Sequence, residues 1–360
     1  MSLPSEENRP TSIGETQIHL LECLSNACAA SGDEGEVRKI VLDEIRPHAD
    51  ELKVDALGNV LATKHSSLEQ PMRVMLAAHM DEVGLMLTQD NGDGIYRFEI
   101  MGGISPTDLA GKAVWIGKEH IPAVIGLRPL HLGKGDSLKK PIGLEDLHID
   151  VGPARGQEKV GDRAVFATKF SRLGPSLRGK AMDNRLGVAT LIELIKNAPT
   201  NIELQAAFTV QEEIGLRGAR VAAYTFNPDL AIVLDSTPAY DLPAWDMDEN
   251  VRYNTRLGAG PAIYVADSST LSDPRLVRYL IRTAEEYHIP YQLRQPGGGG
   301  TDAGAIHKQR AGIPSVSVSV PGRYHHGPAS IVRLSDWQHT IDLVSVALAG
   351  LKRELLASER

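Results

Sequence analysis

Helical and strand-like spacings of apolar residues alternate in the first part of the chain. Over residues 16–48 the apolar side chains recur at helical spacing with an interruption at Ser31-Gly32-Asp33, which predicts two helices. Residues 52–65 alternate between apolar and polar side chains around Leu57-Gly58-Asn59, a pattern typical of a β-hairpin. Residues 73–78 form an apolar run that ends at His79, which indicates a buried strand.

The middle of the chain differs from its two flanks. Between residues 84 and 175, Gly and Pro punctuate short β-type runs such as 112–116 and 123–127, which predicts an all-β segment. Beyond residue 176, strand and helix patterns alternate. There we expect helices at 186–196, 216–224, 274–287 and 336–356, and strands at 203–210, 230–234, 262–265, 291–294 and 315–320. The pattern predicts an α/β domain over residues 1–83 and 176–360, interrupted by a β-rich insert over residues 84–175.

Composition and charge narrow the class of protein. The 360 residues are 42% apolar, enough for a sizeable core, and no apolar run approaches the roughly 20 residues of a membrane-spanning helix. The polar, proline-bearing N-terminus does not resemble a signal sequence, so we expect a cytoplasmic protein. The net charge of −8 without a basic run argues against nucleic acid. Cys23 and Cys28 are expected to be buried structural thiols without a disulfide.

Most of the potential metal ligands and catalytic acids stand at or near the ends of the predicted strands. One of them, His326, follows the last predicted strand. Because the carboxyl ends of parallel strands open onto one crevice, we expect these side chains to converge. They are His79, Asp81, Asp183, Glu212, Glu213, Asp235 and His326.

Two of these positions also have plain structural interpretations. The spacing of His79 and Asp81 lets the carboxylate hydrogen-bond the far ring nitrogen of a metal-bound imidazole, although a single His at a strand end is often structural. Asp183 precedes a predicted helix and could cap it, but its two oxygens could also bridge two metal ions. The convergence with other ligands favours the metal interpretation for both.

Glu212 and Glu213 follow an apolar strand directly, where adjacent acids repel and lose hydration unless a cation offsets them. They could instead lie in a solvated turn. In the functional interpretation one binds a metal and the other removes a proton from a metal-bound water, and sequence order does not assign the two roles. Asp235 is capped, paired or ligating, and of the adjacent His325 and His326 at most one need be a ligand.

The glycine run Gly297–Gly300, followed by Thr301-Asp302, has two interpretations. Its backbone amides could cradle phosphate, but the Lys and Ser or Thr of a P-loop are missing. We therefore predict a wall of the substrate pocket.

Together these stretches resemble the M42 metallo-aminopeptidases, the group that includes tetrahedral, glutamyl and deblocking aminopeptidases. The resemblance covers nearly the whole chain. It is carried by Ala78-His79-Met80-Asp81-Glu82-Val83-Gly84, Gly179-Lys180-Ala181-Met182-Asp183-Asn184-Arg185, Gln211-Glu212-Glu213-Ile214-Gly215-Leu216-Arg217-Gly218-Ala219, Val233-Leu234-Asp235, Gly299-Gly300-Thr301-Asp302-Ala303 and Arg323-Tyr324-His325-His326.

The resemblance assigns roles that spacing leaves open. It implies that His79 and Asp235 bind opposite metals, that Asp183 bridges them, and that Glu212 is the general base. It implies that the remaining ligands are Glu213 and His326. The second of the two histidines is chosen because the family's ligand stands second after Arg-Tyr, and the chain departs from the family in having His325 where an apolar residue is usual and Gly327 where Ser is common.

The resemblance also implies a fold, a reaction and an assembly. The fold would be a mixed-sheet α/β/α zinc-peptidase catalytic domain with an inserted small β-barrel-like dimerisation domain. M20 peptidases, by contrast, place their extra domain after the ligand equivalent to Asp235. The reaction would be hydrolysis of N-terminal residues from short peptides with two divalent ions, zinc or cobalt, with manganese also compatible. The family further implies a cis peptide after Asp183 and dimers that assemble into a tetrahedral dodecamer.

Two other functions are compatible with part of the sequence. A glycoside hydrolase would need two carboxyls flanking a sugar and usually aromatic platforms, and only 5% of the residues are aromatic. A catalytically inactive metal-binding scaffold would usually lack the base, whereas Glu212 is present.

Overall fold

A computed structural model describes residues 11–127, 141–153, 157–242, 255–357 and 359. The polar N-terminal segment expected at residues 1–11 lies almost wholly outside the described residues. The same holds for residues 128–140 and 154–156 of the predicted insert, and for residues 243–254.

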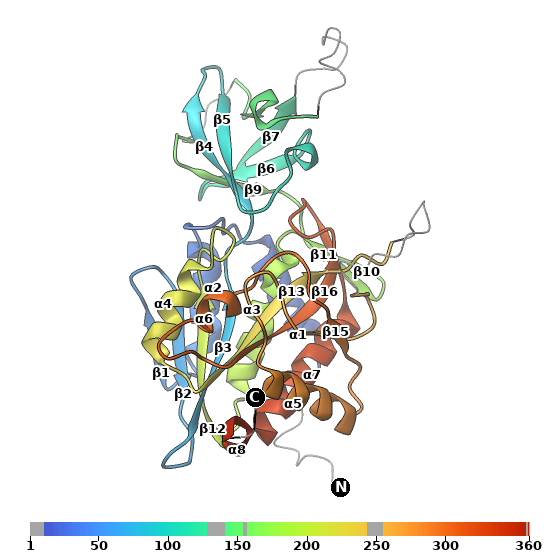
Figure 1. Ribbon diagram of the computed structural model, residues 1–360. Helices are drawn as coiled ribbons and strands as arrows, with labels where there is room; N and C mark the ends of the chain where they lie inside the picture. The colour runs from blue at the N-terminus through green and yellow to red at the C-terminus, as the bar shows by residue number, and fades with distance from the viewer. Residues whose placement is uncertain (1–10, 128–140, 154–156, 243–254, 358, 360) are drawn as a thin grey trace.

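A large mixed sheet forms the centre of the molecule (Figure 1). Its four innermost strands, β12, β3, β13 and β16, run parallel, and antiparallel strands flank them. In pairing order the strands are β1 (Glu51–Val54), β2 (Val60–Lys64), β12 (Ile202–Thr209), β3 (Met72–His79), β13 (Leu230–Pro238), β16 (Ser315–Arg323), β17 (Ser330–Arg333), β11 (Ser176–Gly179) and β10 (Ser171–Leu173), with β14 (Ala262–Tyr264) pairing β16 and β15 (Gln292–Arg294) pairing β14.

Helices cover both faces of this sheet. Side chains of β3 alternate between the two cores: Val74 and Leu76 pack with α1, α3 and α7, whereas Met75 and Ala77 pack with α4 and α6. This three-layer α/β/α arrangement confirms the predicted fold class. The helices are α1 (Glu15–Asn26), α2 (Gly35–Ile45), α3 (Met182–Lys196), α4 (Arg217–Phe226), α5 (Pro274–Glu286), α6 (Ala303–Ile306), α7 (Leu334–Gly350) and α8 (Glu354–Ala357).

A closed six-stranded barrel stands apart from the large sheet, at the top of Figure 1. It has its own core, in which Leu85, Phe98 and Ile125 are buried. Its strands in order are β4 (Gly84–Asp90), β5 (Ile95–Met101), β8 (Leu147–Asp150), β7 (Ile121–Leu127), β6 (Ala113–Ile116) and β9 (Arg163–Phe166), with single-turn 3₁₀ helices at Pro106–Asp108 and Leu144–Asp146. The barrel confirms the β-barrel-like insert. Its domain boundaries and its role in dimerisation stay predictions.

Several elements differ from their predicted form. The helix expected at 336–356 is broken into α7 and α8, because Leu351 takes an extended conformation and packs into the core, where the Asn201 amide donates to the carbonyls of Leu348 and Leu351. β10, inside the segment predicted as the insert, pairs with β11 in the large sheet. Among the described residues, no helix is long and apolar enough to cross a membrane.

The thiols also differ from their predicted environment. Cys23 and Cys28 are free, as expected, but both are only half-buried, so the prediction of buried structural thiols is wrong. Cys23 lies on the partly exposed face of α1, and Cys28 lies beyond the end of that helix.

Candidate metal centre

Side chains from distant parts of the chain meet in a cavity of about 570 Å³ beside the carboxyl ends of the parallel strands. They come from the end of β3, the first turn of α3, the turn after β12, β13 itself and the β16–β17 connection. The cavity is lined by all six residues predicted as ligands or base, namely His79, Asp183, Glu212, Glu213, Asp235 and His326.

Two groups of potential ligands share Asp183. In one group the Nε2 atom of His79 lies 3.3 Å from Asp183 Oδ1 and 3.6 Å from Asp235 Oδ1. In the other the Nε2 atom of His326 lies 3.5 Å from Asp183 Oδ2 and 3.4 Å from Glu213 Oε2. Within each group the potential ligand atoms lie within 4.8 Å of one another. Asp183 thus presents one carboxylate oxygen to each group.

The backbone at Asp183 turns its carboxylate toward these histidines. Asp183 and Asn184 have non-helical torsions, and Asp183 does not cap α3, so the capping interpretation is wrong. The peptide bond between Asp183 and Asn184 is cis, as the family resemblance implied.

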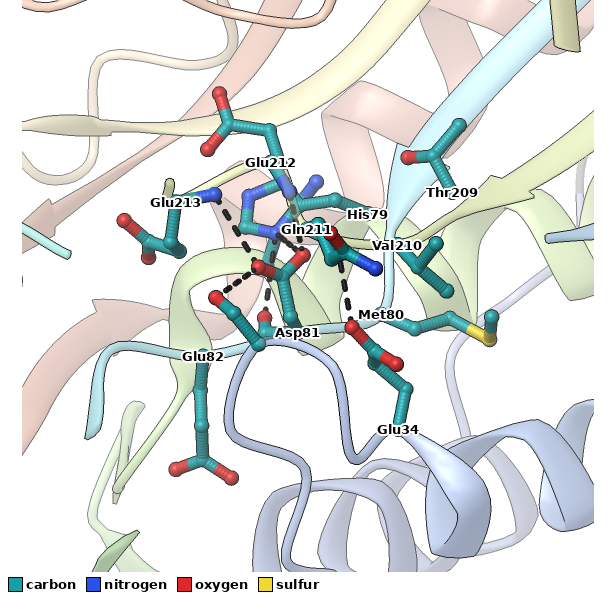
Figure 2. A network of polar contacts seen from close by, with 12 residues as sticks. Glu34, His79, Met80, Asp81, Glu82, Thr209, Val210, Gln211, Glu212 and Glu213 are labelled. Carbon is teal, nitrogen blue, oxygen red and sulfur yellow. Dashed lines mark hydrogen bonds and ion pairs between the residues drawn. The ribbon is translucent and has the colours of Figure 1, made fainter. Parts of the chain in front are cut away.

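Asp81 contacts both His79 and the turn that carries Glu212 and Glu213 (Figure 2). Its Oδ1 atom lies 3.4 Å from His79 Nδ1, on the far side of the ring from Asp183. The same carboxylate accepts hydrogen bonds from Ser31 Oγ at 2.6 Å and from the backbone N–H groups of Glu212 and Glu213 at 3.0 and 3.2 Å. One buried carboxylate therefore orients the imidazole and fixes the turn that carries both glutamates. Sequence reasoning predicted only the first of these contacts.

The two adjacent glutamates point in different directions from this turn (Figure 2). Glu213 belongs to the group with His326, whereas Glu212 belongs to neither group although it lines the same cavity. Burial and the neighbouring carboxylates of Glu213 and Asp235 raise the pKa of Glu212 well above its usual value, against the opposing effect of His79. A free carboxyl with a raised pKa is suited to accept and return a proton.

The chemistry of the cluster fits divalent cations. Burial, aided by Asp183, raises the pKa of Glu213 to about 8, against the opposing effect of His326. Burial disfavours charge on His79, yet Glu212, Asp183 and Asp235 raise its pKa well above the usual range. Asp183 Oδ1 is buried without a hydrogen-bond partner among the described residues. Carboxylate oxygens and imidazole nitrogens that are crowded together and partly without hydrogen-bond partners are suitable ligands for zinc, cobalt or manganese.

Both histidines of the β16–β17 connection contact Asp183. His325 Nδ1 lies 3.3 Å from Asp183 Oδ2, but no ligand group includes His325. His326 also approaches Glu213, and its Nδ1 atom lies 3.2 Å from the carbonyl oxygen of Gly103. Gly103 belongs to the connection that follows the barrel strand β5. A Cβ at Gly103 would meet the His326 ring at 2.9 Å, so this close approach requires glycine. The geometry favours the second histidine.

Asp302 is a buried acid to which sequence reasoning gave no role of its own. Thr209 Oγ1, at the end of β12, donates to its Oδ2 atom at 2.5 Å, and its Oδ1 atom has no partner among the described residues. Burial, with Asp235 and Asp81, raises its pKa to about 7 against the opposing effects of His79 and Thr209. The preceding glycines Gly298–Gly300 line the cavity, as predicted, and an acid two residues after them was the available signal.

Comparison with known proteins points to one enzyme family. A family model described as M42 glutamyl aminopeptidase matches residues 58–343. The chain is 37% identical over 341 residues to a protein of Acetivibrio thermocellus named as an aminopeptidase, with 93% of this chain and 99% of that protein covered. It is 32% identical to the glutamyl aminopeptidase of Lactococcus lactis, with 94% and 97% covered. It is 31% identical to the lysyl aminopeptidase of Pyrococcus furiosus, with 88% and 92% covered.

Solved structures agree with these relatives. A TET aminopeptidase from a marine sediment archaeon superposes with a TM-score of 0.90 at 33% identity, covering 95% of this chain and 98% of that one. The TET1 peptidase of Pyrococcus horikoshii, which can assemble into a tetrahedron or a large octahedral shell, gives 0.82 at 32% identity, covering 93% and 100%. A Thermotoga maritima protein named endoglucanase gives 0.74 at 31% identity, covering 91% and 96%.

Proposed function

Because this chain belongs to the M42 glutamyl aminopeptidase family, and is thus an aminopeptidase, we propose that it removes N-terminal residues from short peptides with the aid of two divalent metal ions. The observation that carries the proposal is the position of Asp183 between two ligand groups in one cavity. His79 and Asp235 would hold one ion, Glu213 and His326 the other, and Asp183 both.

Two ions held in this way would polarise the scissile carbonyl, lower the pKa of the attacking water and bind the free amino group of the peptide. Glu212 takes the proton of that water as its oxygen bonds to the carbonyl carbon. The C–N bond then breaks, and Glu212 returns the proton to the leaving amine. Its exclusion from both ligand groups and its buried carboxyl support this role.

Asp81 takes a supporting role in this proposal. It fixes the ring of His79 and the backbone of the Glu212-Glu213 turn through the contacts described above. A hydrogen-bonded carboxylate behind a metal-bound imidazole keeps the ring oriented and raises its basicity.

The test of this proposal is the substitution Glu212→Gln. We expect the variant to bind the same amount of zinc, cobalt or manganese as the wild type and to lose turnover of aminoacyl-p-nitroanilides by roughly 10²–10⁴-fold. The exposed Glu69→Gln is the matched control and should keep full activity. A Glu212→Gln enzyme with wild-type turnover would refute the assignment of the base.

The preferred N-terminal residue is open, because the chain is about equally identical to a glutamyl and a lysyl aminopeptidase. A panel of acidic, basic and aliphatic aminoacyl-p-nitroanilides, assayed after reconstitution with each metal, measures specificity and metal preference together.

We also propose a cytoplasmic, homo-oligomeric enzyme in which the barrel mediates dimerisation within a dodecamer. Support comes from the similarity to a TET1 peptidase that forms tetrahedral and octahedral shells.

Glycoside hydrolysis is a second candidate, because one similar structure bears the name endoglucanase. Among the described residues that line the cavity, Tyr264 is the single aromatic one, which leaves little surface for stacking a sugar. The acids in the cavity are accounted for by the ligand groups and the base. Peptide hydrolysis therefore predicts no action on cellulose, and cellulose hydrolysis that survives a chelator would contradict it.

A further inference from the structure

A second cavity, of about 360 Å³, lies between the first two helices and the barrel. Cys28, Glu36 and Lys39 line it from the helical side, and Trp115, Lys118 and Arg163 line it from the barrel side. None of these residues takes part in the proposed peptide hydrolysis.

Three of the lining or neighbouring side chains carry metal-ligand atoms and face one another. They come from three separate segments: Cys28 follows α1, Glu36 lies in the first turn of α2, and His120 lies in the β6–β7 turn of the barrel. One ligand atom from each lies within 4.8 Å of the other two. Glu36 is already fixed, since its Oε1 atom lies 2.6 Å from His120 Nε2 and its Oε2 atom accepts the backbone N–H of Cys28 at 2.9 Å.

The imidazole is held in position by its own turn. His120 has a left-handed backbone with φ of 49°, which only a few per cent of non-glycine residues adopt. Its ring stacks on Trp115 with centroids 5.7 Å apart and an interplanar angle of 15°. The stacked ring directs Nε2 toward Glu36, so this nitrogen is already positioned to bind a metal ion.

We propose that Cys28, Glu36 and His120 form a third metal site, for zinc or a similar thiophilic divalent ion, which joins the barrel to the first helices. Thiolate, carboxylate and imidazole are the ligand types of protein zinc sites, and three protein ligands leave a fourth position for water from the cavity. On binding, the thiol gives its proton to solvent and the sulfur bonds to the metal.

The charge balance favours a cation despite the basic residues in the same cavity. Lys39, Lys118 and Arg163 repel a cation, but solvent and salt screen that repulsion. A thiolate and a carboxylate bonded directly to the ion bring two negative charges to contact distance. The site therefore neutralises a divalent ion through its own ligands.

Cobalt substitution provides a selective test, because a thiolate-to-cobalt charge-transfer band in the near ultraviolet reports only a cysteine ligand. The chain has two cysteines and neither lies in the cavity of the candidate metal centre, so Cys23→Ser and Cys28→Ser form a matched pair. We expect the band and three cobalt ions per chain in the wild type and in Cys23→Ser. Cys28→Ser should lose the band and one ion and keep its aminopeptidase activity.

The ligand from the barrel is tested by His120→Asn, since Asn tolerates the left-handed backbone while removing the imidazole. We expect at least a tenfold loss of cobalt affinity at the thiolate site. As a second measurement, zinc should protect Cys28 from iodoacetamide in the Cys23→Ser chain. A wild type with only two cobalt ions and no band, or a band that persists in Cys28→Ser, would overturn the proposal and leave the Glu36–His120 contact as a simple ion pair. The total of three ions rests on the proposed function, whereas the thiolate band and the protection of Cys28 report this site alone and separate the two proposals.

Discussion

Glu82 holds two buried cations directly beside the acidic cluster. It accepts hydrogen bonds from Lys180 Nζ at 2.7 Å and from Arg185 Nη2 at 2.9 Å, and all three side chains are almost completely buried. Burial lowers the pKa of Lys180, and Glu82 opposes that effect. The two positive charges against one negative charge offset part of the negative charge gathered at Asp81 and Asp183.

Glu82→Gln should therefore destabilise the fold strongly, because both cations would stay buried without a carboxylate. We expect the free energy of unfolding to fall by about 3–5 kcal/mol in urea denaturation. The exposed Glu69→Gln, which removes the same charge from the surface, is the control and should change it by less than about 0.5 kcal/mol. Equal unfolding midpoints for both variants would show that Glu82 does not hold the cations.

Asp302 and Thr209 form a second buried pair, near the turn that carries the proposed base, Glu212. Thr209 donates to Asp302 through its hydroxyl and accepts the backbone N–H of Met80 at 2.8 Å through its carbonyl. The pair thereby ties the end of β12, three residues before Glu212, to both β3 and the glycine-rich wall. We regard Asp302 as a positioning residue.

Asp302→Asn and Thr209→Val should each lower kcat by about tenfold with unchanged metal content, since a small displacement of the base slows proton transfer. Their effects should not add, because both remove the same bond, and a double-mutant cycle measures that coupling. Thr225→Val, whose hydroxyl donates within α4 to Val221, is the control and should leave kcat unchanged. Fully additive losses would contradict the shared role.

The β16–β17 connection, which carries both candidate histidines, is anchored by an ion pair at its base. Arg323 Nε donates to Asp241 Oδ1 at 2.6 Å, and the residues that follow include two with left-handed backbones, Tyr324 and His326. Burial raises the pKa of Asp241, but Arg323 and the Leu257 backbone N–H outweigh it, so the pKa lies below its usual value. Strained backbone of this kind persists only where its surroundings fix it.

Asp241→Asn should lower the free energy of unfolding by about 1 kcal/mol at pH 7. A carboxyl whose folded pKa lies below its unfolded value, about 3.9, stabilises fully above that value and loses its contribution as pH falls through the folded pKa. The gap between wild type and variant in urea midpoints should thus be constant from about pH 5 to pH 7 and close below about pH 4. A gap as wide at pH 3 as at pH 7 would contradict the ion-pair mechanism.

At the level of elements, hydrophobic patterns located the strands and missed their polar ends. The pattern ends β13 at residue 234 and β16 at residue 320, yet the two strands stay paired through Asp235↔Ser319 to Pro238↔Gly322. The β13 continuation brings Asp235, Ser236 and Pro238 to the cavity, and the β16 continuation is Pro321-Gly322-Arg323, so a search for apolar runs detects neither. Asp235 consequently lies within a strand instead of following it. The strands β10, β11 and β17, of three or four residues each, were also missed, because runs this short give no clear alternation of apolar and polar side chains.

At the level of the whole molecule, the sequence was enough to predict that the candidate ligands lie close together, because parallel strands share one carboxyl edge. It could not show that Asp81 bonds the backbone of Glu212 and Glu213, which lie about 130 residues away in sequence. Nor could Gly and Pro punctuation give the barrel its strand order, in which β9 closes against both β4 and β6. Both features depend on long-range pairing that no local pattern encodes.

The outer face of the barrel provides the test of its proposed role in dimerisation. Along β7, Ala123 and Ile125 point into the barrel core while Val124, between them, is 48% exposed, and Val160 before β9 is 52% exposed. Apolar side chains on a face that binds a second copy would lose water on assembly, and a charge there would oppose it. We expect Val124→Glu/Val160→Glu to shift native mass spectra from the full assembly toward smaller species. Leu68→Glu, an equally exposed apolar position in the β2–β3 connection, is the control for added charge. An assembly that is unchanged in the double variant would place the dimer contact on another surface, whereas dissociation of both variants would point to charge alone.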